Sequence, residues 1–529
     1  MEEIIKKELK GVKFIDKEDV AKLQRKIARK YNVPPPGKVE ILQAASHLQV
    51  KTNIKKKPIR SLSGVAVVTV LTKEFPCPGK CLDCPREANL PKSYLSGEPA
   101  VERAKLLNFD PYLQVQGRIR ALEKQGHPTD KIELIVISGT WSSLPRSYQT
   151  HFIERCFQAA NEYGKRPLPK KNKKFFKLEK LQQLNEKAQH RIVGLTLETR
   201  PDWINIKEIE RMRLLGCTRI ELGVQSISDE ILKINRRGHT VEATIEATKL
   251  LKDAGFKVCY HIMPGILGSN PSLDLEQTKT LFKDFRFRPD MLKIYPCVVT
   301  KGSVLYSLWK KGKYHPYTDK VLVKLLARMK RYIPPYVRIL RVIRDIPSQA
   351  IEGGSKVSNL REVVKQTMEK EGHRCRCIRC REARDLNLNF KHSKLIRRDY
   401  YASGGKEVFL SFEDTEKDRL FAFLRLRLPL NNIYDRKDVS SFLQKPLRDA
   451  ALIREIHTYG QLTPLGQKLG AVQHYGLGRK LVKEAENIAR QAGYKKIAVI
   501  SGIGVREYWR SFGYRLNDTY MVKKTNSQI

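Results

Sequence analysis

Six short apolar runs alternate with amphipathic segments between residues 64 and 345. The runs are rich in β-branched residues and nearly continuous in apolar character, which is typical of parallel strands buried on both faces. The predicted strands are 65–71, 131–138, 192–198, 218–224, 257–263 and 291–296. Helical patterns such as LDLEQTKTLFKDF separate them. The alternation predicts an α/β fold with a partial TIM-type (β/α)6 barrel, whose active face lies where the strands end.

The pattern changes on either side of this predicted barrel, which we place at residues 63–345. Residues 1–62 are Lys-rich with helical periodicity, and residues 346–395 contain the cysteine-rich stretch EGHRCRCIRCREARD. In 396–529, strand patterns such as RLFAFLRLRL precede a glycine-containing helix start and the run KIAVISGIG, which indicates an α+β domain. We therefore predict four parts, divided at these boundaries.

The excess of positive charge indicates a class of binding partner. The 529 residues include 101 Lys and Arg against 56 Asp and Glu, a formal net charge of +45. Such an excess attracts polyanions and favours a nucleic acid as partner. The run 55–60 is either a nucleic-acid-facing arm or a solvated linker. The basic insert 164–180 is a mobile lid, an anion-binding loop or a disordered solvated loop. No apolar run is long enough for a membrane span and the start lacks a signal-peptide pattern, so we expect a cytoplasmic protein.

Ten cysteines in a reducing compartment do not suggest a disulfide framework. Three of them, Cys77, Cys81 and Cys84, directly follow the first predicted strand. Three thiolates can hold three irons of a [4Fe–4S] cluster and leave the fourth iron open to a small ligand. A zinc knuckle with its fourth ligand elsewhere is the alternative.

A second cysteine group lies between the barrel and the C-terminal domain. Cys375, Cys377 and Cys380 have the spacing of zinc ligands, and no predicted strand precedes them. A structural zinc ion is the simplest role, with the fourth ligand open between His373 and a residue distant in sequence. A redox-active thiol group is the alternative.

Polar or small residues end three more predicted strands. Ser138, Gly139 and Thr140 end the second strand, LETRPDW follows the third, and Glu221 and Gln225 end the fourth. Each alone is an ordinary polar βα loop. Together, on one face of a barrel, they predict a ligand site.

A glycine turn enters an amphipathic helix in VQHYGLGRKLVKEAENIAR. Gln473, Gly476 and Gly478 fit the pattern Gln/Arg-x-x-Gly-x-Gly/Ala, which lets backbone N–H groups face a pyrophosphate at a helix N-terminus. Packing alone is the alternative reason for the glycines. The order strand, turn, helix, strand resembles a GNAT acetyltransferase, and the segment resembles its acetyl-CoA site.

An aromatic pair follows the last long predicted strand, in GVREYWRSFGY. Tyr508 could donate a proton or a hydrogen bond to a thioester or a departing thiolate, as acyl transfer requires. A core aromatic is the alternative role.

The first cysteine loop resembles that of the radical S-adenosylmethionine (SAM) superfamily, in which SAM chelates the open iron. That superfamily usually has an aromatic residue before the last cysteine, where this chain has Asp83. A radical SAM barrel, a zinc-binding linker and a GNAT domain in one chain resemble the catalytic subunit of the Elongator tRNA-modifying complex, including its stand-alone archaeal and bacterial forms. The phrases that carry this resemblance are LPRSYQTHFI, ETRPDW, GCTRIELGVQS, RRGHTVEAT, LKIYPCVV, RRDYYASGGKEVFLSFED and QHYGLG.

The resemblance implies an enzyme that uses a SAM-derived radical and acetyl-CoA to modify carbon 5 of the wobble uridine, leaving a carboxymethyl precursor. Cys77, Cys81 and Cys84 would bind the cluster. The strand-end residues would contact SAM: Ser138, Gly139, Thr140, Glu221 and Gln225. The residues expected to contact acetyl-CoA are Glu455, Ile456, His457, Thr458, Gln473, Gly476, Leu477, Gly478, Arg479, Tyr508 and Trp509.

Trp509 departs from the tyrosine pair of the resembled family, and an indole cannot replace a phenol as an acid. The anticodon stem-loop of tRNA is the expected partner, no membrane is expected, and the oligomeric state is left open with a homodimer as one option. A protein lysine (histone) acetyltransferase is the competing hypothesis, which the basic charge opposes because histone tails are themselves basic. A non-catalytic tRNA-binding scaffold is the third, which the presence of all three cluster cysteines opposes.

Overall fold

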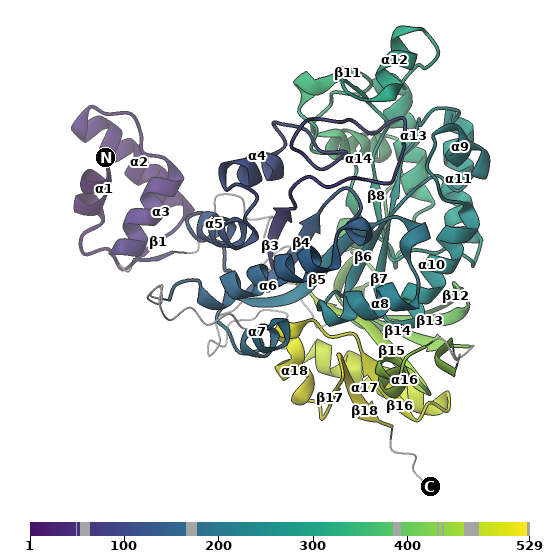
Figure 1. The fold of residues 1–529 in the computed structure, drawn as a ribbon. Helices are drawn as coiled ribbons and strands as arrows, with labels where there is room; N and C mark the ends of the chain where they lie inside the picture. The colour runs from purple at the N-terminus through teal and green to yellow at the C-terminus, as the bar shows by residue number, and fades with distance from the viewer. Residues whose placement is uncertain are drawn as a thin grey trace.

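The computed structural model describes residues 1–48, 50–52, 64–165, 177–383, 393–430, 433–435, 439–459 and 476–525. Three sequence predictions fall wholly or mostly outside these ranges: the basic run 55–60, most of the insert 164–180, and Gln473. The chain forms a small N-terminal helical unit, a central half-barrel and a C-terminal sheet domain (Figure 1).

The N-terminal unit has its own small core and stands to one side of the barrel in Figure 1. It comprises α1 (Glu2–Leu9), β1 (Phe14–Ile15), α2 (Lys17–Tyr31), α3 (Lys38–His47) and β2 (Lys51–Thr52). α2 begins with a capping box, in which the Asp16 carboxylate accepts from the backbone N–H of Asp19 and the Asp19 carboxylate accepts from that of Asp16. This signal is local, so the helix start is set by the sequence itself.

The barrel sheet is parallel throughout and curves into a half-barrel. In spatial order its strands are β10 (Arg338–Arg341), β8 (Met291–Ile294), β7 (Lys257–Ile262), β6 (Arg219–Gln225), β5 (Arg191–Thr199), β4 (Lys131–Ile137) and β3 (Ala66–Leu71). The six predicted strands are present, each within two residues of its expected ends. The sheet has seven strands rather than six, because β10 adds an edge strand.

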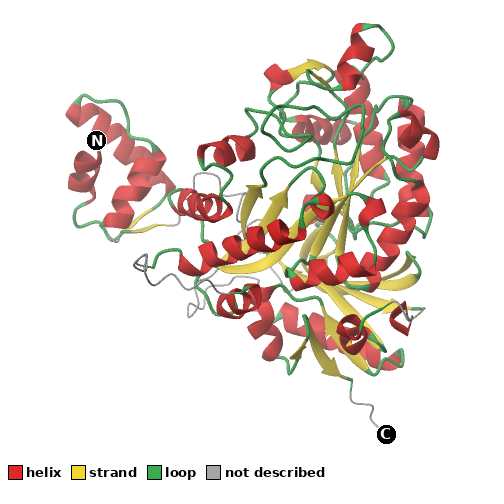
Figure 2. Cartoon of the chain, viewed as in Figure 1, coloured by secondary structure: helices red, strands yellow, loops and turns green. Residues whose placement is uncertain are grey.

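Helices cover the outer face of this sheet (Figure 2). They are α4 (Pro99–Leu106), α5 (Pro111–Glu123), α6 (Arg146–Glu162), α7 (Leu178–Asn185), α8 (Ile206–Leu214), α9 (Asp229–Ile234), α10 (Val241–Asp253), α11 (Pro271–Lys283) and α13 (Asp319–Arg331). Side chains of Asn205, Thr240 and Asn270 cap three of them by accepting from a backbone N–H in the first turn. The concave face is only partly filled: buried and half-buried residues alternate along β4.

Five further elements lie outside the two main sheets. β9 (Val299–Thr300), α12 (Val304–Lys310) and β11 (Ile351–Gly353) belong to the end of the barrel opposite the C-terminal sheet, where Figure 1 shows α12 and β11, whereas α14 (Leu360–Lys370) and α15 (Ile378–Arg381) precede the C-terminal sheet in the chain. β11 pairs with β9 in antiparallel fashion. The second cysteine group spans the turn between α14 and α15 and part of α15 itself.

The C-terminal domain is a mixed sheet. In spatial order its strands are β12 (Lys394–Ala402), β13 (Gly405–Asp414), β14 (Arg419–Pro429), β15 (Ala450–Thr458), β16 (Lys496–Val499), β18 (Tyr520–Lys524) and β17 (Arg515–Asn517). Its helices are α16 (Ser441–Leu447), α17 (Leu477–Gln491) and α18 (Arg506–Arg510). β15 and β16 are parallel and pair only as far as Ile453 and Val499, so the rest of β15 diverges from its neighbour.

The C-terminal sheet packs against the amino ends of the barrel strands. Arg454 of β15 donates to Asp290, just before β8, at 2.9 Å, and both side chains are fully buried. A Cβ on Gly502 would lie 2.0 Å from the carbonyl oxygen of Val193 in β5, so only glycine fits there. The two domains therefore share one close interface. No helix in the described ranges is long and apolar enough to cross a membrane.

Candidate functional site

The first cysteine loop lies at the carboxyl end of β3. The Cys77 sulfur lies 3.7 Å from the hydroxyl of Thr140, at the end of β4. A Cβ on Gly79 would lie 3.4 Å from the Cys81 sulfur and 3.6 Å from the Cys77 sulfur, so this glycine lies next to both thiols. The ammonium of Lys92 donates to the carbonyl of Gly79 at 2.6 Å and fixes the loop.

The distances between sulfurs distinguish the two cysteine groups. The sulfurs of Cys375, Cys377 and Cys380 lie within 4.8 Å of one another, whereas those of Cys77, Cys81 and Cys84 do not meet this limit. A tetrahedral zinc ion with Zn–S bonds of about 2.3 Å brings its sulfurs to about 3.8 Å of one another. The wider first group therefore fits a multi-iron cluster better than a single ion, and the compact second group fits one ion.

Asp83 has an ionic partner in the cluster loop. Its buried carboxylate lies 3.7 Å from the guanidinium of Arg237, which also donates to the carbonyl of Gly223 at 3.1 Å. Burial opposes the charge of Arg237, but Cys81 and Asp83 raise the arginine's pKa above its ordinary value. Burial, with Asp83 beside it, raises the pKa of the Cys84 thiol to about 12.

The predicted SAM residues after β4 and β6 border a common space. Ser138 is 1% exposed, and within the described chain its hydroxyl has no hydrogen-bond partner. Gln225 has a left-handed backbone (φ 66°), and its side-chain oxygen also lacks a partner there. A buried polar atom without a hydrogen-bond partner costs folding free energy. The Ser138 hydroxyl and the Gln225 side-chain oxygen are therefore suited to bind a polar ligand.

Glu221 lies deeper in the barrel than the strand end on which it was predicted. Lys293 contacts its carboxylate, and His261 Nε2 lies 3.0 Å from it. Burial opposes ionisation, but Lys293 and His261 hold the pKa of Glu221 well below its ordinary value. Glu198 of β5 is paired in register with Glu221 and is the more exposed of the two, with Tyr94 Oη donating to it at 3.3 Å. Sequence reasoning singled out LETRPDW but not this carboxylate.

The first turn of α17 forms the second part of the site. Gly476 precedes the helix with φ 67°, and no side chain caps the N-terminus. A Cβ on Gly478 would lie 2.8 Å from the hydroxyl of Tyr508, so this glycine allows the phenol to reach the helix N-terminus. Free backbone N–H groups at a helix start favour an anion such as a pyrophosphate.

The diverging part of β15 lies beside this turn. Ile456 Cδ1 and Thr458 Cγ2 lie 3.8 and 3.9 Å from the position of a Cβ on Gly478. Glu455 accepts from Arg425 at 2.8 Å, and its pKa is lowered by Lys257 and Arg425 against the opposing effect of burial.

Tyr508 and Trp509 have different surroundings. Tyr508 is 41% exposed, and partial burial raises its pKa. Trp509 is 2% exposed and packs edge-on against Tyr514, with ring centroids 5.3 Å apart. The phenol is therefore the more accessible of the two side chains.

One cavity of about 2100 Å³ joins the two parts. It runs from the cluster loop through the concave face of the half-barrel to β15 and α17. The predicted residues on its wall are Cys77, Cys81, Cys84, Ser138, Gly139, Thr140, Glu221, Gln225, Glu455, Ile456, His457, Thr458, Gly476, Gly478, Arg479, Tyr508 and Trp509. Leu477 lies instead in the hydrophobic core, and Cys375, Cys377 and Cys380 lie off this wall.

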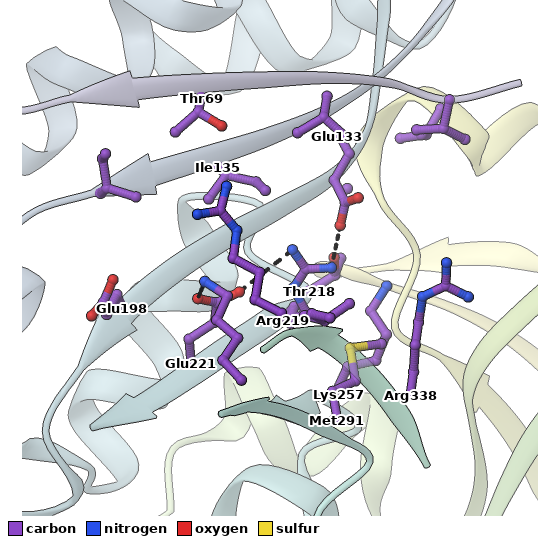
Figure 3. A pocket seen from close by; sticks show the side chains of 18 of the residues that line it. Thr69, Glu133, Ile135, Glu198, Thr218, Arg219, Glu221, Lys257, Met291 and Arg338 are labelled. Atoms are coloured by element: carbon purple, nitrogen blue, oxygen red, sulfur yellow. Dashed lines mark hydrogen bonds and ion pairs between the residues drawn. The ribbon is translucent and has the colours of Figure 1, made fainter. Parts of the chain in front are cut away.

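Charged side chains cross the cavity inside the barrel (Figure 3). Arg219 of β6 reaches Glu133 of β4 across the intervening β5, and its other nitrogen lies 3.6 Å from Glu221. An ordinary TIM barrel is packed with apolar side chains, whereas this half-barrel keeps a polar lumen.

Comparisons with known proteins agree with this geometry. A model of the radical SAM superfamily matches residues 77–278, and one of the radical SAM C-terminal domain matches 289–370. The tRNA uridine(34) acetyltransferase of Methanocaldococcus infernus is 46% identical over 99% of this chain and 98% of that protein. Elongator complex protein 3 of Bos taurus is 38% identical over 96% and 93%. The structure of the archaeal M. infernus Elp3 with an N-terminal deletion is similar at a TM-score of 0.73 and 45% identity, covering 87% of this chain and 99% of that one.

Proposed function

Because the chain belongs to the family of Elongator complex protein 3 and tRNA uridine(34) acetyltransferases, we propose that it modifies carbon 5 of the wobble uridine of tRNA with an acetyl group taken from acetyl-CoA. The observation that carries this proposal is the single cavity that joins the cysteine loop to the first turn of α17. A radical generated at one end and a thioester held at the other can then meet without leaving the protein.

The radical SAM match implies a [4Fe–4S] cluster and SAM. Cys77, Cys81 and Cys84 would hold the cluster, which with SAM would supply a 5′-deoxyadenosyl radical for removing a hydrogen atom from the acetyl methyl group. Ser138 and Gln225 offer SAM the unpaired polar atoms described above. Glu198 is the more available carboxylate for a ligand, since it is more exposed and Glu221 is already engaged by Lys293.

In the C-terminal domain, the first turn of α17 would bind the pyrophosphate of acetyl-CoA through its backbone N–H groups. The Tyr508 hydroxyl, beside Gly478, would donate a hydrogen bond to the thioester or to the departing thiolate. Trp509 would support this tyrosine by packing. The acetyl methylene radical would add to carbon 5 of the uridine, and loss of the carbon-5 proton and of one electron, returned to the oxidised cluster, would restore the ring. Attack of water on the thioester carbon would then break the C–S bond, release CoA as a thiol and leave a carboxymethyl group on the uridine.

We further propose roles for the remaining parts of the chain. The division at 1–62, 63–345, 346–395 and 396–529 would give a tRNA-binding N-terminal region, a radical SAM domain, a zinc linker and a GNAT domain. The net charge of +45 supports tRNA as the partner, bound by its anticodon stem-loop. Three close sulfurs support a structural zinc ion at Cys375, Cys377 and Cys380. We propose that the protein acts in the cytoplasm, because tRNA is modified there.

The decisive experiment is anaerobic reconstitution of the whole chain with iron and sulfide, followed by SAM, acetyl-CoA and tRNA under reducing conditions. We expect 5′-deoxyadenosine and a uridine modified at carbon 5. Cys81→Ala should remove both products and the iron while leaving zinc bound, and Cys156→Ala, in the core, serves as control. Absence of 5′-deoxyadenosine from the wild-type protein would overturn the proposal. Acetylation of a lysine peptide without tRNA would support the lysine acetyltransferase instead.

A further inference from the structure

Glu186 lies on the barrel side of the domain interface, at the carboxyl end of α7. Its side chain is buried, and each carboxylate oxygen meets one arginine of α18. Oε1 lies 2.9 Å from Arg506 Nη1, and Oε2 lies 2.6 Å from Arg510 Nη1. Tyr508 lies between these arginines on the same short helix. One carboxylate of the barrel therefore binds both ends of the helix that carries the tyrosine.

The position of Glu186 is itself fixed by the start of β5. The neighbouring residue, Asn185, is fully buried. Its side chain donates to the carbonyl of His190 at 3.1 Å and accepts from the backbone N–H of Ile192 at 2.7 Å. These bonds join the end of α7 to the first residues of the strand. The carboxylate is therefore held by the barrel framework rather than by a free loop.

α18 has little freedom on its other sides. Gly502, in the segment leading to it, contacts the backbone of β5 so closely that a Cβ would lie 2.0 Å from the Val193 carbonyl oxygen. At the far side, the Tyr508 hydroxyl lies 2.8 Å from the position of a Cβ on Gly478. The helix is thus wedged between β5 and the first turn of α17.

Loss of the Glu186 charge would release this arrangement. Arg506 is 4% exposed, and its pKa is lowered by burial, an effect that Glu186 opposes. Without the carboxylate, a buried guanidinium would lose its counter-charge and move toward water. Because Tyr508 lies two residues away on the same helix, its hydroxyl would move with it.

We propose that Glu186 is a positioning residue for the acetyl-CoA site: through Arg506 and Arg510 it aims the Tyr508 hydroxyl at the first turn of α17. This inference rests on the proposed function, because it takes that turn as the acetyl-CoA site. It follows that a residue of the barrel sets the affinity of the C-terminal domain for its ligand.

The test is calorimetric titration of the full chain with CoA. Glu186→Gln should weaken binding about tenfold, the effect of losing about 1.4 kcal/mol. Tyr508→Phe should also weaken it. If Glu186 acts through the phenol hydroxyl, Glu186→Gln should add little in the Tyr508→Phe background. Glu179→Gln, at an exposed position of α7, is the matched control and should bind like wild type.

The double-variant comparison separates positioning from a general structural role. If Glu186→Gln weakens binding equally in the wild-type and Tyr508→Phe backgrounds, or leaves the affinity at the wild-type level, the inference is overturned while the proposed function stands. Failure of the wild-type chain to bind CoA would overturn both. Should Glu186→Gln not fold, Arg510→Gln takes its place, because Arg510 is partly exposed and forms one of the two ion pairs. It should weaken binding about threefold, and only when Tyr508 is present.

Discussion

His457 shows how the surroundings tune one side chain on the cavity wall. Its ring packs against Tyr459, with centroids 4.4 Å apart, and stacks on Phe423 at 6.1 Å. Burial and the nearby Arg338 guanidinium lower its pKa from 6.5 to about 4. The imidazole is therefore neutral at pH 7, and a neutral imidazole offers one ring nitrogen as a hydrogen-bond acceptor. Within the described residues, Nε2 has no partner, so it is free to meet a ligand or water.

The lowered pKa of His457 predicts a dependence of stability on pH. A histidine with a folded pKa near 4 and an unfolded pKa near 6.5 binds fewer protons in the folded state, so stability falls as the pH drops from about 6.5 toward 4. Above pH 6.5 both states are neutral and the effect vanishes. Between pH 7.5 and 5, wild type should lose about 2 kcal/mol more unfolding free energy than His457→Phe. Denaturant unfolding at the two pH values measures this, and parallel profiles would contradict it.

For single residues, the sequence identifies a functional group when its partners lie within a few positions of it in the chain. Cys77, Cys81 and Cys84 lie in one loop, so their spacing alone indicates a metal site. Glu198 and Glu186 give no such signal, because their partners come from elements far away in the chain. A carboxylate next to a strand or helix end resembles any solvated residue until the fold brings its partner to it.

At the scale of elements, the two glycines at the start of α17 serve different purposes. Gly476 has φ 67°, and a Cβ there would meet nothing within 4 Å. Gly478 has ordinary helical geometry, but a Cβ there would lie 2.8 Å from the Tyr508 hydroxyl. The first glycine is required by the backbone and the second by the space that the phenol occupies.

We predict opposite effects of alanine at these two positions. Gly478→Ala should displace the Tyr508 hydroxyl and weaken CoA binding by about tenfold. It should not lower stability, because alanine favours a helix over glycine by up to about 1 kcal/mol. Gly476→Ala should destabilise by about 1–2 kcal/mol, the cost of a left-handed residue with a side chain, and should affect binding less. Calorimetry and thermal unfolding of both variants provide the measurement. The reverse pattern would show that Gly478 does not make room for the tyrosine.

The apolar pattern predicts most barrel strands but not which of their side chains face the cavity. Six strands follow from continuous Val- and Ile-rich runs, whereas β10, with the sequence RILR, is a four-residue edge strand with as many arginines as apolar residues. β4 was expected to be buried on both faces, yet Glu133 and its alternate neighbours face the cavity. A half-barrel does not close around its lumen, so one face of such a strand remains available to polar groups.

For the whole molecule, the interface between the two domains is both polar and buried. Arg427 of β14 donates to Asp253 at 2.7 Å and to Glu407 at 2.9 Å, and all three are at most 1% exposed. The sequence RLFAFLRLRLP predicts a strand with one face exposed to solvent. The arginines are buried because the barrel covers that face, which no local pattern reveals. Breaking such a buried pair by removing one partner typically costs about 3–5 kcal/mol.

Gly502 provides the sharpest test that the two domains act as one unit. A Cβ at this position would lie 2.0 Å from the backbone oxygen of Val193, and a backbone contact cannot be relieved by rotating a side chain. Gly502→Ala should therefore push α18 away from β5 and open the interface. Amide hydrogen exchange should rise at the start of β5 and around residues 500–505, and CoA affinity should fall with the displacement of Tyr508.

Gly117→Ala in α5 is the matched control for this change. A Cβ there would lie 3.5 Å from a flexible Leu107 methyl, which is ordinary van der Waals contact. This variant should keep the exchange pattern and affinity of the wild type and gain a little helix stability. If Gly502→Ala instead exchanges like wild type across β5 while CoA affinity falls, the tyrosine helix is held by the C-terminal domain alone. If exchange rises both at the start of β5 and around residues 500–505, the barrel supports the part of the cavity that would hold the thioester.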